Sequence, residues 1–194
     1  VPVGRDQIQA LSAVKRELSE EDYMGESQEL MRKLNLPRLP QRIEAFDISN
    51  ISGQEACGSM VSFYNGRPDK SNYRRFKIKE VKGIDDYAML SEVIRRRYSR
   101  LAEENKAFPD LILIDGGRQH LLTAKRQLDK LLIEALVISL AKEKEEIYTL
   151  ARKEPFSLLY DSGALHLVQR VRDEAHRFAV SYHHVLRRKK AIGR

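Results

Sequence analysis

The spacing of apolar residues changes from a helical to a strand-like period near residue 40. Between residues 5 and 35 the apolar positions recur at helical intervals, which predicts two helices. Ser19, followed three residues later by Asp22, fits a capping box in this region. Prolines close to residue 40 then interrupt the helical pattern. We therefore predict a helical linker or extension over residues 1–40 and a separate domain over residues 41–190.

Beyond residue 41 short apolar runs alternate with amphipathic stretches. The pattern predicts, in order, strands at 42–49, 56–66 and 71–81, a helix at 85–102, a strand at 109–117, a helix at 119–132, a strand at 134–141, a short edge strand at 146–151 and a helix at 161–190. Three antiparallel strands followed by alternating helices and strands predict an α/β fold, a mixed sheet with helices on both faces. This element order is that of the ribonuclease H fold, so we expect a ribonuclease H-like sheet preceded by a short helical segment.

Composition limits the possible classes of protein. The chain has 194 residues, of which 42% are hydrophobic, enough for the core of one ordinary domain. No apolar run approaches the roughly 18 residues of a membrane span, and the start shows no secretory signal pattern. The only cysteine, Cys57, can form neither an internal disulfide nor a cysteine metal site. These features predict a protein of the reducing cytoplasm that contacts no membrane.

Two aspartates share a position that is unusual for a charged residue. Asp47 ends the apolar run IEAFD and Asp115 ends the run LILID. Ligands gather at the carboxyl ends of parallel strands, and two neighbouring carboxylates there repel unless a divalent cation lies between them. The alternative is that Asp115 caps the next helix and Asp47 begins a turn. For either residue alone the structural role is favoured, whereas the pair favours a site for a divalent metal such as Mg²⁺.

A histidine in the last predicted helix is a weaker candidate. His176 shares a helix face with Arg172 and His183, away from the apolar stripe. It could bind metal or transfer a proton near neutral pH. The alternative, which spacing alone favours, is a surface histidine paired with Glu174 or Asp173.

Two further aspartates, Asp85 and Asp86, open the helix at 85–102. Carboxylates are favoured at this position as caps and by the helix dipole. A structural role is therefore the default for both, although one of them could reach a nearby metal site.

Positive charge gathers in three segments. The net charge is +7, and basic residues cluster at 72–79, 94–100 and 186–194. Such clusters suit contacts to the phosphates of a nucleic acid, but a solvated surface is about as good an explanation for any one of them. The candidate DNA contacts are Arg74, Arg75, Lys77, Arg95, Arg96 and Arg118.

Four motifs, in order and at matching separations, resemble one known family. They are LPRLPQRIEAFDISNISG, GIDDYAMLSEVIRRRYSR, FPDLILIDGG and HLVQRVRDEAHRFA. Over residues 36–185 they resemble the C-terminal endonuclease domain of UvrC, the incision subunit of bacterial nucleotide excision repair. The resemblance implies a ribonuclease H-like fold, a site for Mg²⁺ or Mn²⁺, and hydrolysis of a phosphodiester bond on the 5′ side of a lesion in double-stranded DNA.

The resemblance also implies roles for individual residues. It makes Asp47 and Asp115 the metal ligands, His176 a catalytic residue and Asp86, rather than Asp85, a further member of the site. This choice of His176 reverses the preference drawn from spacing. The resemblance further implies a DNA-damage (SOS) response protein of the cytoplasm.

Members of the family are longer than this chain. They also carry a GIY-YIG nuclease domain for the 3′ cut, a segment that binds UvrB and helix-hairpin-helix motifs, which we do not find in these residues. We therefore expect one domain of a longer protein, with UvrB contacted mainly elsewhere. Two alternatives are a non-catalytic module for DNA docking or assembly and another ribonuclease H-like nuclease.

Overall fold

The computed structural model describes residues 18–51 and 55–191, so the first of the two helices predicted before residue 35 lies outside the described residues. The elements are α2 (Glu20–Lys33), β1 (Arg42–Ile51), β2 (Glu55–Tyr64), β3 (Arg67–Pro68), the 3₁₀ helix η1 (Lys70–Asn72), β4 (Arg74–Lys77), α3 (Asp86–Glu103), β5 (Leu111–Asp115), α4 (Arg118–Lys130), β6 (Val137–Ala141), β7 (Glu146–Tyr148), β8 (Phe156–Ser157) and α5 (Gly163–Ala191).

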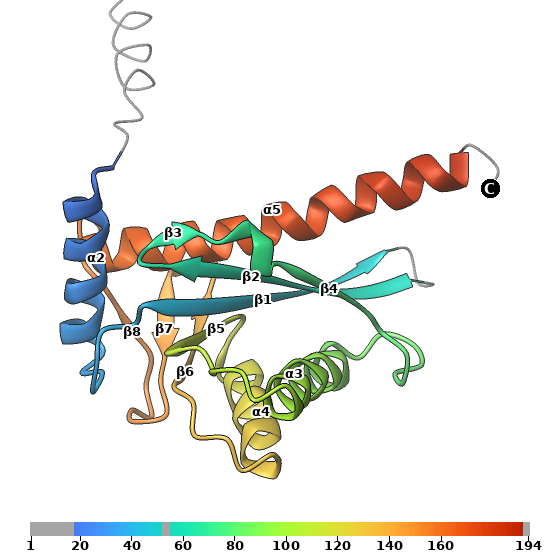
Figure 1. Ribbon diagram of the computed structural model, residues 1–194, viewed down its shortest axis with the longest axis horizontal. Helices are drawn as coiled ribbons and strands as arrows, with labels where there is room; N and C mark the ends of the chain where they lie inside the picture. Colours follow the sequence, from blue (N-terminus) through green and yellow to red (C-terminus); the bar gives the residue numbers. More distant parts are fainter. Residues whose placement is uncertain (1–17, 52–54, 192–194) are drawn as a thin grey trace, which may run out of the picture.

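One mixed sheet organises the molecule. Its strand order is β3-β2-β1-β5-β6-β7-β8, and β4 pairs with β2 beside β3. The central strands β1, β5 and β6 are parallel, while β2 and β7 run antiparallel to their neighbours. Helix α5 covers one face and α3 and α4 cover the other (Figure 1). The predicted mixed sheet with helices on both faces is therefore confirmed. None of the helices in the described ranges is both long and apolar enough to cross a membrane.

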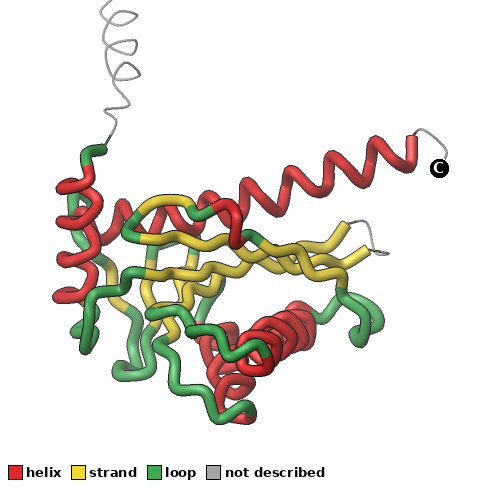
Figure 2. The backbone as a smooth tube through the Cα atoms, viewed as in Figure 1, coloured by secondary structure: helices red, strands yellow, loops and turns green. Residues whose placement is uncertain are grey.

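Alternation along β1 sends side chains to two separate cores. Ile43 and Ala45 pack in the core beneath α5, whereas Phe46 packs in the core beneath α3 and α4. Beyond β5, β1 continues in its pairing with β2, which also pairs with β4 as far as Cys57 (Figure 2). The same alternation places Asp47 on the α5 side.

A buried ion pair joins β1 to α3. Glu44 has no exposed surface, and its carboxylate accepts hydrogen bonds from Arg97 at 2.6 Å and from the Tyr98 hydroxyl at 3.0 Å. Burial, and then the charge of Glu44, raise the pKa of the Tyr98 hydroxyl well above its usual value. The negative charge that alternation sends into this core is thus neutralised within the core.

The helical segment before β1 packs against the rest of the chain. Ser19 and the Asp22 side chain form the predicted capping box at the start of α2. Glu26 in α2 pairs with Arg170, and Glu29 accepts the backbone N–H of Gly163 at the start of α5. A domain boundary near residue 40 stays a prediction.

Three details differ from the sequence prediction. The predicted strand at 71–81 is reduced to β4, because the nearly buried Glu92 carboxylate accepts the backbone N–H groups of Lys79 and Glu80 and draws the chain away from the sheet. The predicted edge strand at 146–151 is shorter and is not an edge, since β8 pairs with it. Tyr87 stands at helical spacing from Leu90 and Ile94, which predicts a place in the apolar stripe of α3, yet it is 45% exposed.

Removing Glu44 should destabilise the fold strongly. Glu44→Ala leaves the Arg97 guanidinium buried without its partner, which we expect to cost about 3–5 kcal/mol of unfolding free energy. The loss of unfolding free energy is measured by urea denaturation monitored by circular dichroism. Glu104→Ala, which breaks the more exposed pair with Arg100, is the control and should have a far smaller effect. Equal effects of the two substitutions would contradict this account of Glu44.

Candidate active site

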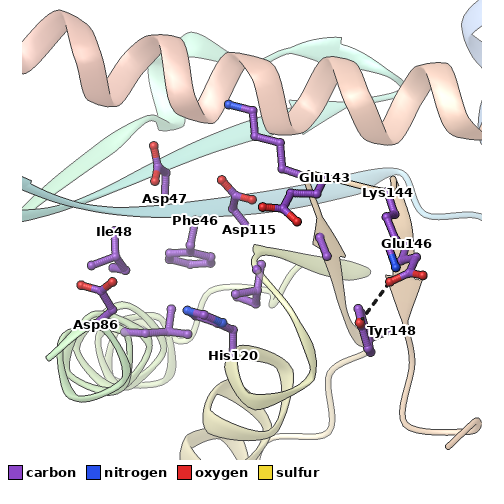
Figure 3. Close-up of a pocket in the computed structure, with 15 residues that line it drawn as sticks. Phe46, Asp47, Ile48, Asp86, Asp115, His120, Glu143, Lys144, Glu146 and Tyr148 are labelled. Carbon is purple, nitrogen blue, oxygen red and sulfur yellow. Dashed lines mark hydrogen bonds between the residues drawn. The ribbon is translucent and has the colours of Figure 1, made fainter. Parts of the chain in front are cut away.

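Strand register places Asp47 and Asp115 side by side. β1 and β5 are parallel and Phe46 is the partner of Ile114, so the residue that follows on each strand is an aspartate. Both carboxylates point toward α5 (Figure 3). Neighbouring strands lie roughly 4.8 Å apart, close enough for one cation to contact both side chains. The predicted meeting of the two aspartates is therefore present in the structure, although only Asp115 ends its strand and Asp47 lies within β1.

Neither aspartate has the structural role that was its alternative. The N-cap residue of α4 is Gly117, which has no side chain, so Asp115 does not cap that helix. β1 continues to Ile51, so Asp47 does not begin a turn. Both carboxylates are left available for a ligand at the end of the sheet.

His176 lies over Asp47 from the middle of α5. Its Nδ1 is 3.3 Å from the Oδ2 atom of Asp47, and its side chain remains 55% exposed. Spacing was right that His176 is partly exposed, but the pairing it favoured, with Glu174 or Asp173, is wrong. Glu174 instead accepts from Arg177 and from the Tyr73 hydroxyl, and Asp173 accepts from Arg172.

The other residues of that predicted helix face do not join the site. The buried Arg172 side chain turns to Glu145 and Asp173. The side chain of His183 lies outside the described residues. His176 is thus the member of the group that the structure brings to Asp47.

Burial makes the charge of Asp47 costly. The side chain is only 10% exposed, and burial, reinforced by the charge of Asp115, raises the pKa of Asp47 to about 6. His176 and Lys142 act in the opposite direction and favour the ionised form. Asp47 is therefore a buried carboxylate whose charge the surrounding side chains compensate only in part.

A cavity of about 550 Å³ opens at this end of the sheet and includes both aspartates. Asp86, the first residue of α3, lines it from the side of α3 (Figure 3). Asp85 is the N-cap residue and accepts the backbone N–H of Ala88 at 2.9 Å. The structure thus separates the two consecutive aspartates into one cap and one member of the cavity wall.

Three polar residues of the site were not singled out from the sequence. His120 lines the cavity and packs against the Tyr87 ring, with 4.7 Å between ring centroids. Lys142 follows β6, so the rule that singled out Asp115 could also have found it. Ser59, the partner of Asp47 on β2, has a buried hydroxyl without a hydrogen-bond partner in the described part of the chain, and only the register reveals it.

Gly116 owes its identity to this packing. Its φ is +135°, and an added Cβ would lie 2.5 Å from the Nδ1 atom of His120. Glycine therefore allows the imidazole to lie directly against the backbone that follows β5.

The donor set fits a hard divalent cation with few protein ligands. Asp47 and Asp115 offer carboxylate oxygens, and their mutual repulsion would be relieved by a cation. Within residues 18–51 and 55–191 no group of three or more His, Cys, Asp or Glu side chains could hold an ion. The arrangement suits Mg²⁺ or Mn²⁺, because such an ion can keep water molecules on its remaining positions.

The six candidate DNA contacts differ in the partners that they already have. Arg95 and Arg96 pair with Glu80 and Glu92. Arg118 donates to the backbone carbonyls of residues 152 and 153. Arg74 and Arg75 have no carboxylate partner among the described residues, and neither does Lys77. The structure therefore distinguishes cations that are already paired from cations that remain available.

A family model and similar curated proteins point to the same family. Residues 31–180 match the model of the UvrC RNAse H endonuclease domain. The UvrABC system protein C of Methanosarcina mazei is 48% identical over 99% of this chain and 37% of its own length. That of Dictyoglomus thermophilum is 48% identical over 98% of this chain and 33% of its own length. The chain thus spans about a third of these relatives.

Among solved structures, the chain is similar to endonuclease V of Ciona intestinalis in complex with DNA containing an inosine. The identity is 15% and the TM-score 0.41, over 66% of this chain and 59% of that chain. Similarity at this level is too remote to support a functional argument.

Neutralising Asp47 should stabilise the protein when no divalent cation is present. A carboxyl group whose folded pKa is raised from 3.8 to about 6 destabilises the fold above pH 6, and the penalty disappears below pH 4. In EDTA at pH 7.5, Asp47→Asn should therefore raise the free energy of unfolding by about 1–3 kcal/mol. The gain should shrink as the pH falls from 7.5 to 4, as measured by urea denaturation at each pH.

The control for this experiment is Asp129→Asn, which removes an exposed carboxylate paired with Lys125. It should change the unfolding free energy by less than about 1 kcal/mol. A loss of stability in Asp47→Asn at pH 7.5 would show that the charge of Asp47 is compensated in the folded protein.

Proposed function

The chain belongs to the family of the UvrC RNase H endonuclease domain, and on that premise we propose that it makes the 5′ incision of nucleotide excision repair. The reaction is hydrolysis of a DNA phosphodiester bond on the 5′ side of a lesion. The observation that carries the proposal is the pair Asp47 and Asp115, which follow the last residues paired between the neighbouring strands β1 and β5, with His176 over Asp47. Asp86 supplements the site from the start of α3.

Asp47 and Asp115 would hold Mg²⁺ or Mn²⁺. A divalent cation in such a site stabilises negative charge on the phosphate and lowers the pKa of a water molecule. Burial keeps the Asp47 carboxylate in one place, and Asp115 is held by the end of β5. These residues therefore fix the position of the reacting phosphate relative to the sheet.

His176 is proposed as the proton-transfer residue. Its Nδ1 is engaged by Asp47, so Nε2 is the ring nitrogen left for a proton. With Asp47 ionised, Nδ1–H donates to the carboxylate and Nε2 can accept the proton of the attacking water. The water oxygen forms its bond to phosphorus as the bond to the leaving oxygen breaks, and the leaving oxygen takes up a proton from solvent.

The substrate and partners are proposed for the longer protein of which this domain would be part. Damaged double-stranded DNA is held through its phosphates by Arg74, Arg75, Lys77, Arg95, Arg96 and Arg118, without base recognition. UvrB is contacted mainly by other parts of that protein. We place the protein in the cytoplasm, in the SOS response.

Loss of either central carboxylate should abolish the 5′ cut. In the full-length protein, Asp47→Asn and Asp115→Asn should each lower the 5′ incision rate at least about a hundredfold, because a cation would lose half of its protein ligands. The assay uses a lesion-containing duplex labelled at one end, with the other UvrABC proteins present. Continued 3′ incision shows that the complex still assembles.

Asp129→Asn is the matched control in this assay and should cut at the wild-type rate on both sides. Wild-type 5′ incision by a folded Asp47→Asn variant would overturn the site assignment. It would favour the alternative of a non-catalytic docking module.

His176→Ala should separate proton transfer from metal binding. Because His176 contacts Asp47 and belongs to no three-ligand cluster, the variant should lose 5′ incision while its Mn²⁺ affinity falls by no more than about 10–100-fold, the usual loss for a residue that orients a metal ligand. Asp115→Asn should weaken Mn²⁺ binding more. Calorimetry or paramagnetic resonance measures both affinities. Equal losses of Mn²⁺ affinity would make His176 a metal ligand instead.

A further inference from the structure

A second cavity lies at the opposite end of α3 from the candidate active site. It has a volume of about 560 Å³ and lies between β4, the start of β1 and the C-terminal part of α3 with the loop that follows. Arg97 pairs with Glu44 at its inner side. The other cationic side chains that line it are Arg42, Arg74, Arg75, Arg96, Arg100 and Lys106. We call this cavity the arginine groove.

Part of the positive charge in the arginine groove is already neutralised. Arg96 pairs with Glu92, and Glu104 lies between Arg100 and Lys106. Glu104 is the only carboxylate residue in the lining of the groove. An excess of positive charge therefore remains in a concave site, where surrounding protein strengthens its field.

Two arginines supply most of that excess. The guanidinium groups of Arg42 and Arg74 have no carboxylate partner within the described ranges. The Arg74 guanidinium donates to the backbone carbonyls of Ser71 and Tyr73 at 2.9 and 2.7 Å, which fixes its position without neutralising its charge. Held arginines lose little freedom when they bind an oxyanion, and their planar forks match phosphate.

The Arg75 side chain crosses to the other face of the sheet and packs against α5. Its guanidinium lies over the Phe178 ring at 4.2 Å and over the Tyr182 ring at 4.9 Å, and it donates to the Ser181 hydroxyl. Aromatic rings orient the cation and leave its full positive charge for an anion. The Arg75 guanidinium is therefore directed toward α5, and the charge of the groove itself comes mainly from Arg42 and Arg74.

The distance between the arginine groove and the active site follows from the residue spacing along α3 and along β1. On α3, Asp86 lines the active-site cavity and Arg100 lines the groove, fourteen residues further on, which is about 21 Å along a helix. On β1, Arg42 and Asp47 are five residues apart, or about 17 Å. A duplex spans such a distance with about five or six base pairs.

We propose that the arginine groove binds the phosphodiester backbone of the duplex about five or six base pairs from the bond that is cut. The identity of the DNA rests on the proposed function, whereas the affinity of the groove for phosphates does not. Arginine forks on phosphates bind independently of sequence, which suits an enzyme directed by damage. The groove would set the position of the duplex and leave the cutting to Asp47 and Asp115.

The first test measures binding without cutting. Arg42→Gln combined with Arg74→Gln removes two unpaired cations from the groove. In EDTA, fluorescence anisotropy of the 194-residue chain with a lesion-containing duplex should show weaker binding. The logarithm of the association constant falls linearly with the logarithm of the salt concentration, and each phosphate contact contributes about 0.9 to that slope. The loss of two contacts should therefore reduce the magnitude of the slope by about two. Thermal unfolding confirms that the variant is folded.

The matched control is Lys33→Gln combined with Arg126→Gln, which removes the same net charge from α2 and α4, outside the arginine groove. It should leave the salt slope near the wild-type value. An unchanged slope in the groove variant, or equal changes in the two variants, would overturn the proposal. The first outcome would leave an acidic protein segment as the ligand of the groove.

The second test locates the contact. Neutral methylphosphonates, introduced one position at a time, should slow 5′ incision by the full-length protein at about five or six base pairs from the cut. The same substitutions should have no further effect in the groove variant. Interference of equal size in both proteins would overturn the proposed position. If no incision is found at all, the proposed function fails while the salt-slope test still decides whether the groove binds DNA.

Discussion

The parallel pairing of β1 with β5 is the contact on which the site depends. Its register sets Phe46 against Ile114, so the next residue on each strand is an aspartate, and both aspartates face α5. A shift of one residue in this pairing would send one carboxylate to the opposite face, because side chains alternate along a strand. The cores on both sides of the sheet resist such a shift, since the apolar residues of β1 and β5 would exchange faces with it.

β1 carries two buried carboxylates, and their different surroundings separate structure from function. Glu44 faces α3, where Arg97 and Tyr98 satisfy both of its oxygens. Asp47, three residues later, faces α5 beside another carboxylate, and burial together with Asp115 raises its pKa to about 6. The first carboxylate holds a helix against the sheet. The second has a partly compensated charge of the kind that a cation could stabilise.

The same distinction applies to the arginines, although they are close together in sequence. Arg95, Arg96 and Arg97 spread around α3 and each finds a carboxylate partner. Arg74 and Arg75 lie on β4, where carbonyl groups and aromatic rings hold their guanidinium groups instead. Net charge therefore indicates little about binding until the partner of each cation is known. The exposed cations without carboxylate partners are the ones whose phosphate contacts require no ion pair to break.

The sequence by itself determined the mixed sheet, most of its strands and helices, and the choice of Asp47 and Asp115, because hydrophobic period and strand-end position are local properties. Motif order also indicated the family and, through it, His176 and Asp86. Spacing alone misjudged His176, since nothing along α5 shows that β1 passes beneath it. Only the tertiary structure decided that contact, the exposure of Tyr87, and the places of Ser59, His120 and Lys142. Each depends on side chains that strand register and helix packing bring together from distant parts of the chain, and no local pattern records such a meeting.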